Sequence, residues 1–127
     1  MKITKDYPGL KETEFGFEFD GSIESEAEIE IELTKTIFVS KRIKAKTYIN
    51  AGDGISAGWG ISAGLHIKCR KILRFTMNLF AGIVVYKKPT ADEQTVECAA
   101  IEGGGEIKSG ILKLLTDKRT TRNEIEN

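Results

Sequence analysis

Large aliphatic residues recur at every sixth position through the middle of the chain. A second apolar residue follows two places after each of the first nine. A period of six matches neither an α-helix, with about 3.6 residues per turn, nor a simple strand, and the frequent glycines also disfavour a helix. The pattern predicts short strands, each with two inward residues and then a corner, as in a parallel β-helix. The recurring aliphatics are Ile31, Ile37, Ile43, Ile49, Ile55, Ile61, Ile67, Leu73, Leu79 and Val85.

Three hexads would make one triangular coil of eighteen residues, so residues eighteen positions apart should stack. The inward columns predicted by this offset are apolar throughout, as the packed interior of a solenoid requires. They are Ile37–Ile55–Leu73, Ile43–Ile61–Leu79, Ala45–Ala63–Ala81 and Val39–Ala57–Phe75. The pattern does not fix the handedness of the coil.

The outward positions fit the same offset, because three glutamates fall beneath basic residues of the next coil. Opposite charges on neighbouring strands are favourable, whereas like charges are not. The predicted pairs are Glu24 with Arg42, Glu26 with Lys44, and Glu28 with Lys46.

Glycine marks the predicted corners. Gly52, Gly58 and Gly64 occupy the fourth position of three successive hexads. We expect access to positive φ to help the chain turn at these places. The run GGG at 103–105 lacks the Lys and Ser/Thr of a phosphate-binding loop and is interpreted as another tight corner.

The chain ends depart from the repeat. Phe15, Phe17 and Phe19 alternate with small or acidic residues, which predicts a half-buried strand that caps the coils. The expected fold is all-β: a short single-domain parallel β-helix of about four coils. We divide the chain into a lead-in and capping strand (1–22), hexad-repeat β-helix (23–86), polar loop (87–95), last coil (96–116) and disordered tail (117–127).

The repeat motif also carries a resemblance. INAGDGISAGWGISAGLHIKCRKI resembles the glycine-rich Ile-x-Ala-Gly repeat proteins of Firmicutes and their prophages, and LFAGIVVYKKPTADEQTVECAAIEGG fits the same pattern. The coil is more distantly similar to bactofilins, right-handed β-helical proteins that polymerise end to end. This chain differs from them in its charged tail, interrupted last coil and Phe-rich lead-in. Hexapeptide acyltransferases share only the period.

Composition narrows the function classes. A chain of 127 residues fits one domain, and its nineteen basic and nineteen acidic residues give a formal net charge of zero. Such a balance is not typical of a nucleic-acid-binding protein, so we expect no direct nucleic-acid contact. No signal peptide is visible, and no apolar run reaches the about 18 residues needed to span a bilayer. We expect a cytoplasmic protein without membrane contact.

The five glutamates at 24, 26, 28, 30 and 32 lie in a stretch without Lys or Arg, from 12 to 32. One interpretation is an acidic strip that mimics nucleic acid and binds a basic host protein. The other is pairing between coils and protection of a strand edge, which we favour because the eighteen-residue offset supplies partners. Glu30 and Glu32 would face Tyr48 and Asn50 instead, so they remain candidate interaction residues.

Two further groups could contact a partner. Lys68, Arg70 and Arg74 point outward in the repeat and could bind phosphate or an acidic surface, although a solvated face is favoured; Lys71 lies near a corner. Trp59 stands between two glycines and should also point outward. It is either an interface anchor or a cover for the flat glycine surface of its own repeats.

The sequence offers no catalytic set. His66 is the only histidine and stands at a corner; a general-base role, as in the hexapeptide acyltransferases, is disfavoured. Cys69 holds an inward position, Cys98 follows the same rule after Val96, and two cysteines make no disulfide framework. A Cys–His zinc site would need more ligands. We expect no enzyme activity, no metal and no cofactor.

The sequence therefore predicts a non-enzymatic, self-associating β-helix protein of phage or mobile-element origin. A homodimer through the β-helix ends is expected, because these ends expose open strand edges. The first alternative is a phage-encoded inhibitor of a bacterial defence nuclease, of the anti-CRISPR type, which would bind a host nucleic-acid-binding protein. The second is a hexapeptide-type acyltransferase fragment. The candidate interaction residues are Trp59, Glu30, Glu32, Lys68, Arg70, Arg74, Phe15 and Phe17.

Overall fold

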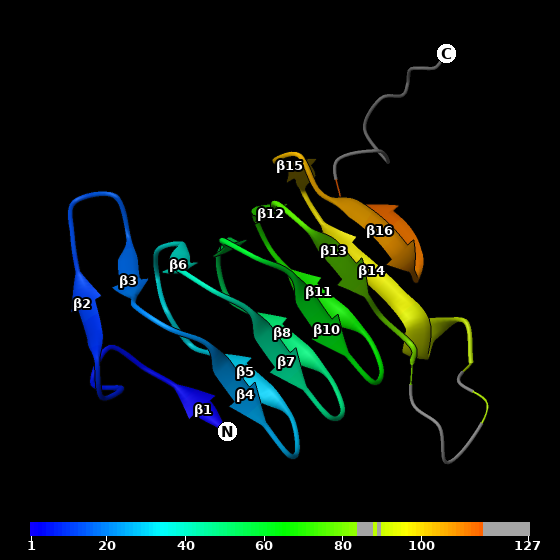
Figure 1. The fold of residues 1–127 in the computed structure, drawn as a ribbon, viewed down its shortest axis with the longest axis horizontal. Helices are drawn as coiled ribbons and strands as arrows, with labels where there is room; N and C mark the ends of the chain where they lie inside the picture. Colours follow the sequence, from blue (N-terminus) through cyan, green and yellow to red (C-terminus); the bar gives the residue numbers. More distant parts are fainter. Residues whose placement is uncertain (84–87, 89, 116–127) are drawn as a thin grey trace.

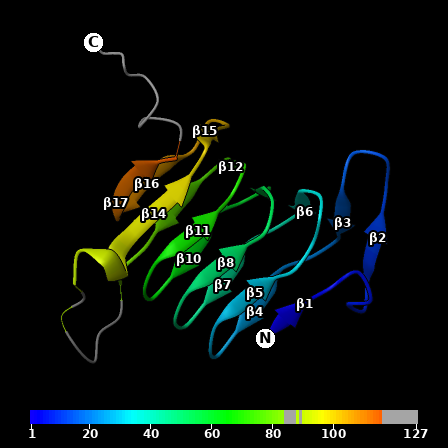
Figure 2. The same cartoon turned by 180° about the vertical axis from the view of Figure 1, so that it is seen from behind.

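The chain coils around a single axis. The computed structural model describes residues 1–83, 88 and 90–115. Its strands form about five turns with three sheets on three sides, and the coils stack in chain order from the N-terminal end to the last strands (Figure 1, Figure 2). The predicted all-β parallel β-helix is therefore confirmed, with about one turn more than expected.

Successive strands of the regular coils belong in turn to three different sheets, called A, B and C. Sheet A contains β1 (Lys2–Ile3), β5 (Ile29–Ile31), β8 (Ile49–Ala51), β11 (Ile67–Cys69), β14 (Thr95–Cys98) and β17 (Ile111–Leu114). Sheet B contains β2 (Leu10–Glu12), β3 (Phe17–Phe19), β6 (Ile37–Val39), β9 (Ile55–Ala57), β12 (Ile72–Phe75) and β15 (Ala100–Glu102). Sheet C contains β4 (Ile23–Ser25), β7 (Ile43–Ala45), β10 (Ile61–Ala63), β13 (Asn78–Phe80) and β16 (Glu106–Ser109). A 3₁₀ turn, η1 (Asp92–Gln94), precedes β14.

The regular coils follow the predicted period. Ile37 lies opposite Ile55 and Ile55 opposite Leu73, each eighteen residues later. Ile61 likewise lies between Ile43 and Leu79. Strands β6 to β11 bury their first and third residues, so two apolar side chains per strand fill the axis of the coil. Burial of these aliphatic columns stabilises the fold, because each coil covers the apolar surface of the next.

The first coil is longer than predicted. Phe17 lies opposite Ile37 and Ile29 opposite Ile49, both twenty residues later. Ile31 does not begin a hexad as expected; it is the second inward residue of β5 and lies opposite Ala51. Leu33 is buried in the extended corner that follows. The sequence concealed the two extra residues because Ile31 also stands six places before Ile37.

The N-terminal end is closed by a different strand from the one predicted. The Phe-rich strand β3 pairs in parallel with β6 and starts the first coil, whereas β2 pairs with β3 in the antiparallel sense. β1 adds a parallel strand beneath β5. Phe17 is buried in the core, but Phe15 lies in the turn before β3 and is 77% exposed. Phe19 is partly buried against the core, so the three alternating Phe residues do not share one environment.

The predicted corners are present, but the proposed reason is wrong at the regular ones. Bends follow β8, β9 and β10 at Gly52, Gly58 and Gly64, yet none of these glycines has a positive φ. Space explains Gly58 instead: a Cβ there would lie 2.2 Å from the Ser40 carbonyl oxygen of the preceding coil. At 103–105 the corner is confirmed, and a Cβ on Gly105 would collide with the buried Phe75 ring at 2.2 Å.

The last coil is interrupted as predicted. Ile67 pairs with Val96, twenty-nine residues later, so the connection between β13 and β14 contains an insertion that leaves the strand register intact. Val85 and parts of the predicted loop lie outside the described residues, as does the predicted tail 117–127. In this coil Val96 and Cys98 are buried, whereas the inward side chains of its later strands are only partly covered; these are Ile101, Ile107, Leu112 and Leu114.

Candidate interaction surfaces

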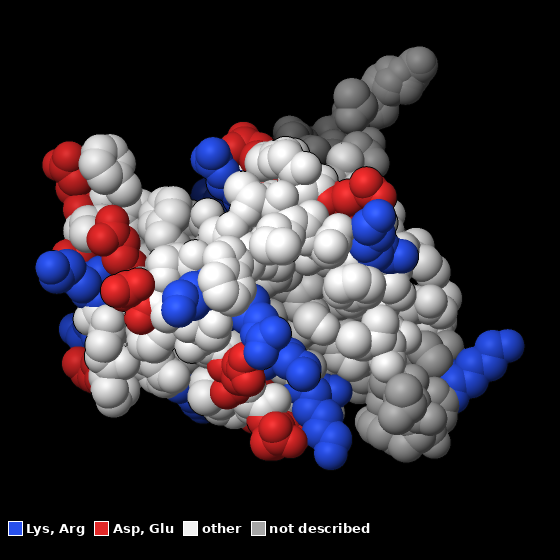
Figure 3. All heavy atoms as spheres, viewed as in Figure 1, with Lys and Arg blue, Asp and Glu red and all other residues white. Residues whose placement is uncertain are grey.

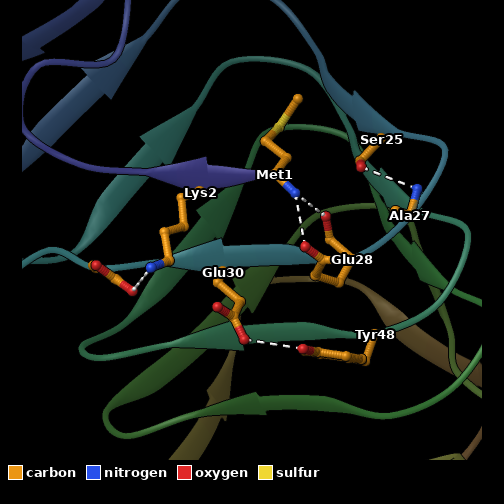
Figure 4. Close-up of polar contacts among 8 residues, drawn as sticks. Met1, Lys2, Ser25, Ala27, Glu28, Glu30 and Tyr48 are labelled. Atoms are coloured by element: carbon orange, nitrogen blue, oxygen red, sulfur yellow. Dashed lines mark hydrogen bonds and ion pairs between the residues drawn. The ribbon is translucent and has the colours of Figure 1, made fainter.

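Four of the five glutamates at 24, 26, 28, 30 and 32 contact partners within the chain. The Met1 ammonium contacts the Glu28 carboxylate at 3.0 Å, and the Tyr48 hydroxyl donates a hydrogen bond to Glu30 at 2.9 Å (Figure 4). The ammonium hydrogen bond lowers the pKa of Glu28, and the Glu30 hydrogen bond raises the pKa of Tyr48. The other contacts are Arg42 with Glu24 at 2.8 Å and Lys2 with Glu32 at 3.5 Å.

The predicted charge pairs are only partly correct. The Glu24–Arg42 ion pair exists, and Glu24 also lies opposite Lys44 in the strand register. The pairing of Glu26 with Lys44 is therefore wrong, because the first coil contains twenty residues rather than eighteen. The expected Glu28–Lys46 pair is replaced by the contact of Glu28 with the chain terminus.

Four of the candidate residues meet in one groove on the outside of sheet A. Glu30 and Glu32 approach it from one end and Lys68 and Arg70 from the other, around Asn50. The groove has a volume of about 580 Å³. Along sheet A the outward side chains alternate in kind, which leaves little uncompensated charge on this face; in order they are Lys2, Glu30, Asn50, Lys68, Glu97 and Lys113.

His66 belongs to a side-chain network beside this groove. Its ring stacks on Tyr48 with centroids 4.9 Å apart, and its Nε2 lies 3.1 Å from the Asn50 side-chain oxygen. Desolvation, followed by the charge of Lys68, lowers the pKa of His66.

Trp59 lines a second groove, on the outside of sheet C. The groove has a volume of about 320 Å³ and lies between two cationic side chains and two apolar ones. Trp59 is 45% exposed, and its ring is covered on one side by Lys41 at 5.5 Å. Met77 and Phe80 were missed by the sequence reasoning, although Met77 stands one coil after Trp59 and the eighteen-residue period could have located it. Its lining includes Arg42, Lys44, Trp59, Ser62, Met77 and Phe80.

The remaining candidates do not join either groove. Arg74 points outward from sheet B, where it lies opposite Ser56 and Glu102. Phe17 is a core residue, with 4% of its surface exposed, and is unavailable to a partner. Phe15 stands alone in the N-terminal turn. The structure thus separates the candidates into a polar groove, an aromatic groove and isolated positions.

The two cysteines are core residues side by side. The parallel register of β11 and β14 sets Cys69 beside Cys98, and both are buried and free. A hydrogen bond to Cys98, together with burial, raises the pKa of the Cys69 thiol. Neither cysteine is accessible as a nucleophile. Within the described ranges, no three His, Cys, Asp or Glu side chains converge in a way that could hold a metal ion.

The C-terminal end of the solenoid exposes unpaired strand edges in the described part of the chain. β15, β16 and β17 each end their sheet, and within the described chain no strand pairs with their outer edges. Leu112 lies opposite the fully buried Val96 but is itself 43% exposed, and none of the described strands stacks on it. Ile111 beside it is 47% exposed. Neither residue was identified from the sequence.

No protein family matches this chain, and neither a curated protein nor a solved structure shows significant similarity to it. Among the described residues there is no helix with the length and apolar character required to cross a membrane.

Proposed function

We propose that the protein is a non-enzymatic, self-associating β-helix that forms a homodimer through its C-terminal end. One observation supports this proposal above all: the outer edges of β15, β16 and β17 are unpaired in the described chain, and Leu112 is exposed at an inward position. Unpaired edges carry free backbone N–H and C=O groups, and a neighbouring copy can satisfy both these groups and the apolar side chains.

A closed dimer is favoured over a filament by the difference between the ends. A filament requires the C-terminal end of one copy to meet the N-terminal end of the next, as a heterologous contact does. At that N-terminal end the short β1 and the antiparallel β2 extend sheets A and B, and β4 ends sheet C. Two C-terminal ends related by a twofold axis would instead pair their edge strands in the antiparallel sense, and this contact would use the C-terminal edges of both copies.

The inhibitor hypothesis receives less support. An acidic strip that mimics nucleic acid must present free carboxylates, yet Glu28 and Glu30 contact partners within the chain. Phage or mobile-element origin remains part of the proposal, based on the Ile-x-Ala-Gly motif. The acyltransferase hypothesis gains nothing from His66, whose ring is stacked and partly desolvated.

Sedimentation velocity over a concentration series tests the dimer. We expect the wild-type protein to shift from monomer to dimer and the Leu112→Glu variant to remain monomeric, because a charge would be buried without a partner. Ile72→Glu is the matched control, since Ile72 is 40% exposed but lies on the side of the coil. A wild-type monomer at every concentration, growth beyond the dimer, or a Leu112→Glu dimer would refute the proposal.

A further inference from the structure

The groove beside Trp59 is a trough along strand β10. The outward side chain of β10 is small, whereas those of its neighbours β7 and β13 are large. Within sheet C, the outward residue of the middle strand is Ser62, which lies between Lys44 and Phe80. Beside it, Gly60 contributes no side chain to the floor. The two flanking strands are separated by two strand spacings, about 10 Å. This width accommodates one extended chain lying along the middle coil.

The apolar wall of the trough consists of residue types that anchor interfaces. Trp59, Met77 and Phe80 are 45%, 56% and 36% exposed, respectively, and together line one hollow. Trp, Phe and Met are enriched at binding interfaces, and exposed apolar side chains that cluster have a different meaning from scattered ones.

The backbone of Trp59 is hydrogen-bonded to the coils on both sides. Its backbone N–H donates to the Lys41 carbonyl oxygen at 2.9 Å, and its own carbonyl oxygen accepts from the Met77 N–H at 2.7 Å. Lys41 lies over the ring at 5.5 Å. The backbone that carries the ring is therefore held between two coils, and the side chain remains partly exposed.

The opposite wall is cationic. Arg42 and Lys44 line it, and Lys44 forms no ion pair with any residue that the structure describes. Figure 3 shows a run of Lys and Arg side chains across this face, with acidic side chains on one flank and a wide uncharged area on the other. A ligand lying in the trough would meet positive charge on one flank and apolar surface on the other.

We propose that this trough docks an extended acidic peptide segment of a partner protein, in which an aromatic or large aliphatic side chain stands between carboxylates. The apolar side chain would lie against Trp59 and Phe80, and a carboxylate would face Lys44, because Arg42 already pairs with Glu24. Nucleic acid is a poorer fit, because a continuous phosphate backbone needs cations along its length. Here Glu24 neutralises Arg42 at 2.8 Å and lies opposite Lys44.

Trp59 is the only tryptophan of the chain, so its fluorescence reports occupancy of the trough directly. The probe is the acetylated, amidated peptide Glu-Glu-Phe-Glu-Glu, with Gln-Gln-Phe-Gln-Gln as the uncharged comparison. We expect a saturable change in emission with the acidic peptide. The Lys44→Glu variant should bind about tenfold more weakly, since it reverses a charge on the wall.

Lys46→Glu is the matched control, because Lys46 is an exposed lysine of the same coil outside the trough. It should change the affinity less than about twofold. Phe80→Ser, which removes the apolar wall, should weaken binding as Lys44→Glu does and provides a second test if one variant fails to fold. Equal melting curves establish that the variants fold.

Three outcomes would overturn the proposal. The first is the absence of a saturable change with the acidic peptide. The second is an equal loss in Lys46→Glu, which would reveal non-specific charge attraction. The third is tighter binding of an eight-nucleotide oligothymidine than of the peptide, which would make single-stranded nucleic acid the occupant. None of these outcomes depends on the dimer, since Leu112 lies at the end of the coil and the trough on its side.

Discussion

Inward apolar side chains are buried at the N-terminal end of this solenoid but partly exposed at its C-terminal end. At the N-terminal end Ile3 and Ile23 are almost completely buried, and Met1, Tyr7 and Leu10 pack against the core. At the C-terminal end Ile101, Ile107, Leu112 and Leu114 also point inward, yet all are partly accessible. Position in the repeat decides which way a residue faces, and a further layer of chain decides whether it is buried.

The largest expected effect separates these two ends. Ile3→Ala should reduce the free energy of unfolding by about 2–5 kcal/mol, because it leaves a cavity beneath the cap. Leu112→Ala should cost about 1 kcal/mol or less in the monomer, since its side chain keeps much of its solvent contact. Urea unfolding at a protein concentration too low for dimerisation measures both free-energy losses. Equal losses would show that the two ends are equally well covered.

Overpacking the middle coils should be the next most costly change. Ala57 lies between Val39 and Phe75 in one inward column, and both neighbours are buried. Ala57→Leu adds volume where no end is available to relax, so we expect a loss of about 1–3 kcal/mol by urea unfolding. A neutral result would mean that the middle coils adapt as freely as the ends.

Two glycines distinguish a tight corner from an open one. Gly58→Ala would bring a Cβ within 2.2 Å of the Ser40 carbonyl oxygen, whereas a Cβ on Gly104 meets nothing within 4 Å. We expect Gly58→Ala to cost about 1–2 kcal/mol and Gly104→Ala to change the stability by less than about 0.5 kcal/mol. Thermal unfolding of both variants makes the comparison, and a larger loss at Gly104 would contradict it.

The smallest effect concerns the contact between Met1 and Glu28. The folded-state pKa of Glu28 lies below the ordinary value of 4.5, because the carboxylate accepts a hydrogen bond from the chain terminus. A depressed pKa contributes stability above pH 4.5 that is lost as the pH falls through the folded value. The NMR signal of the Met1 methyl group should therefore shift only below pH 4.5.

A Glu28→Gln variant provides the control for this titration. Its Met1 signal should show no such transition over the same range. A native midpoint at or above pH 4.5 would show that the ammonium contact is absent in solution.

Much of the architecture could be derived from the sequence because the repeat is strict where three hexads make one coil. Ile37, Ile55 and Leu73 stack as expected. The first coil was misjudged because Ile31 satisfies two patterns at once, and only the strand register shows which applies. Periodicity alone cannot reveal an insertion that is itself apolar.

The surfaces were harder to predict than the fold. Glu30 and Lys68 belong to one groove because sheet A brings distant segments together, which an outward phase alone does not reveal. Phe15 and Phe17 differ in burial although they alternate in sequence, because the strand begins only at Phe17. The sequence did not predict the exposure of Leu112, since the repeat tells only that this side chain faces inward and not whether another strand stacks on it.

Because each regular coil has eighteen residues, the length of the solenoid changes in steps of one coil. Each regular coil adds one strand spacing, about 4.8 Å, along the axis. Excision of residues 49–66 would rejoin the chain at an equivalent corner and yield a shorter rod with every later strand on its original side. Excision of only six residues would rotate all later strands onto a different side. The length of the solenoid can therefore change by whole coils while the structures of both ends stay unchanged.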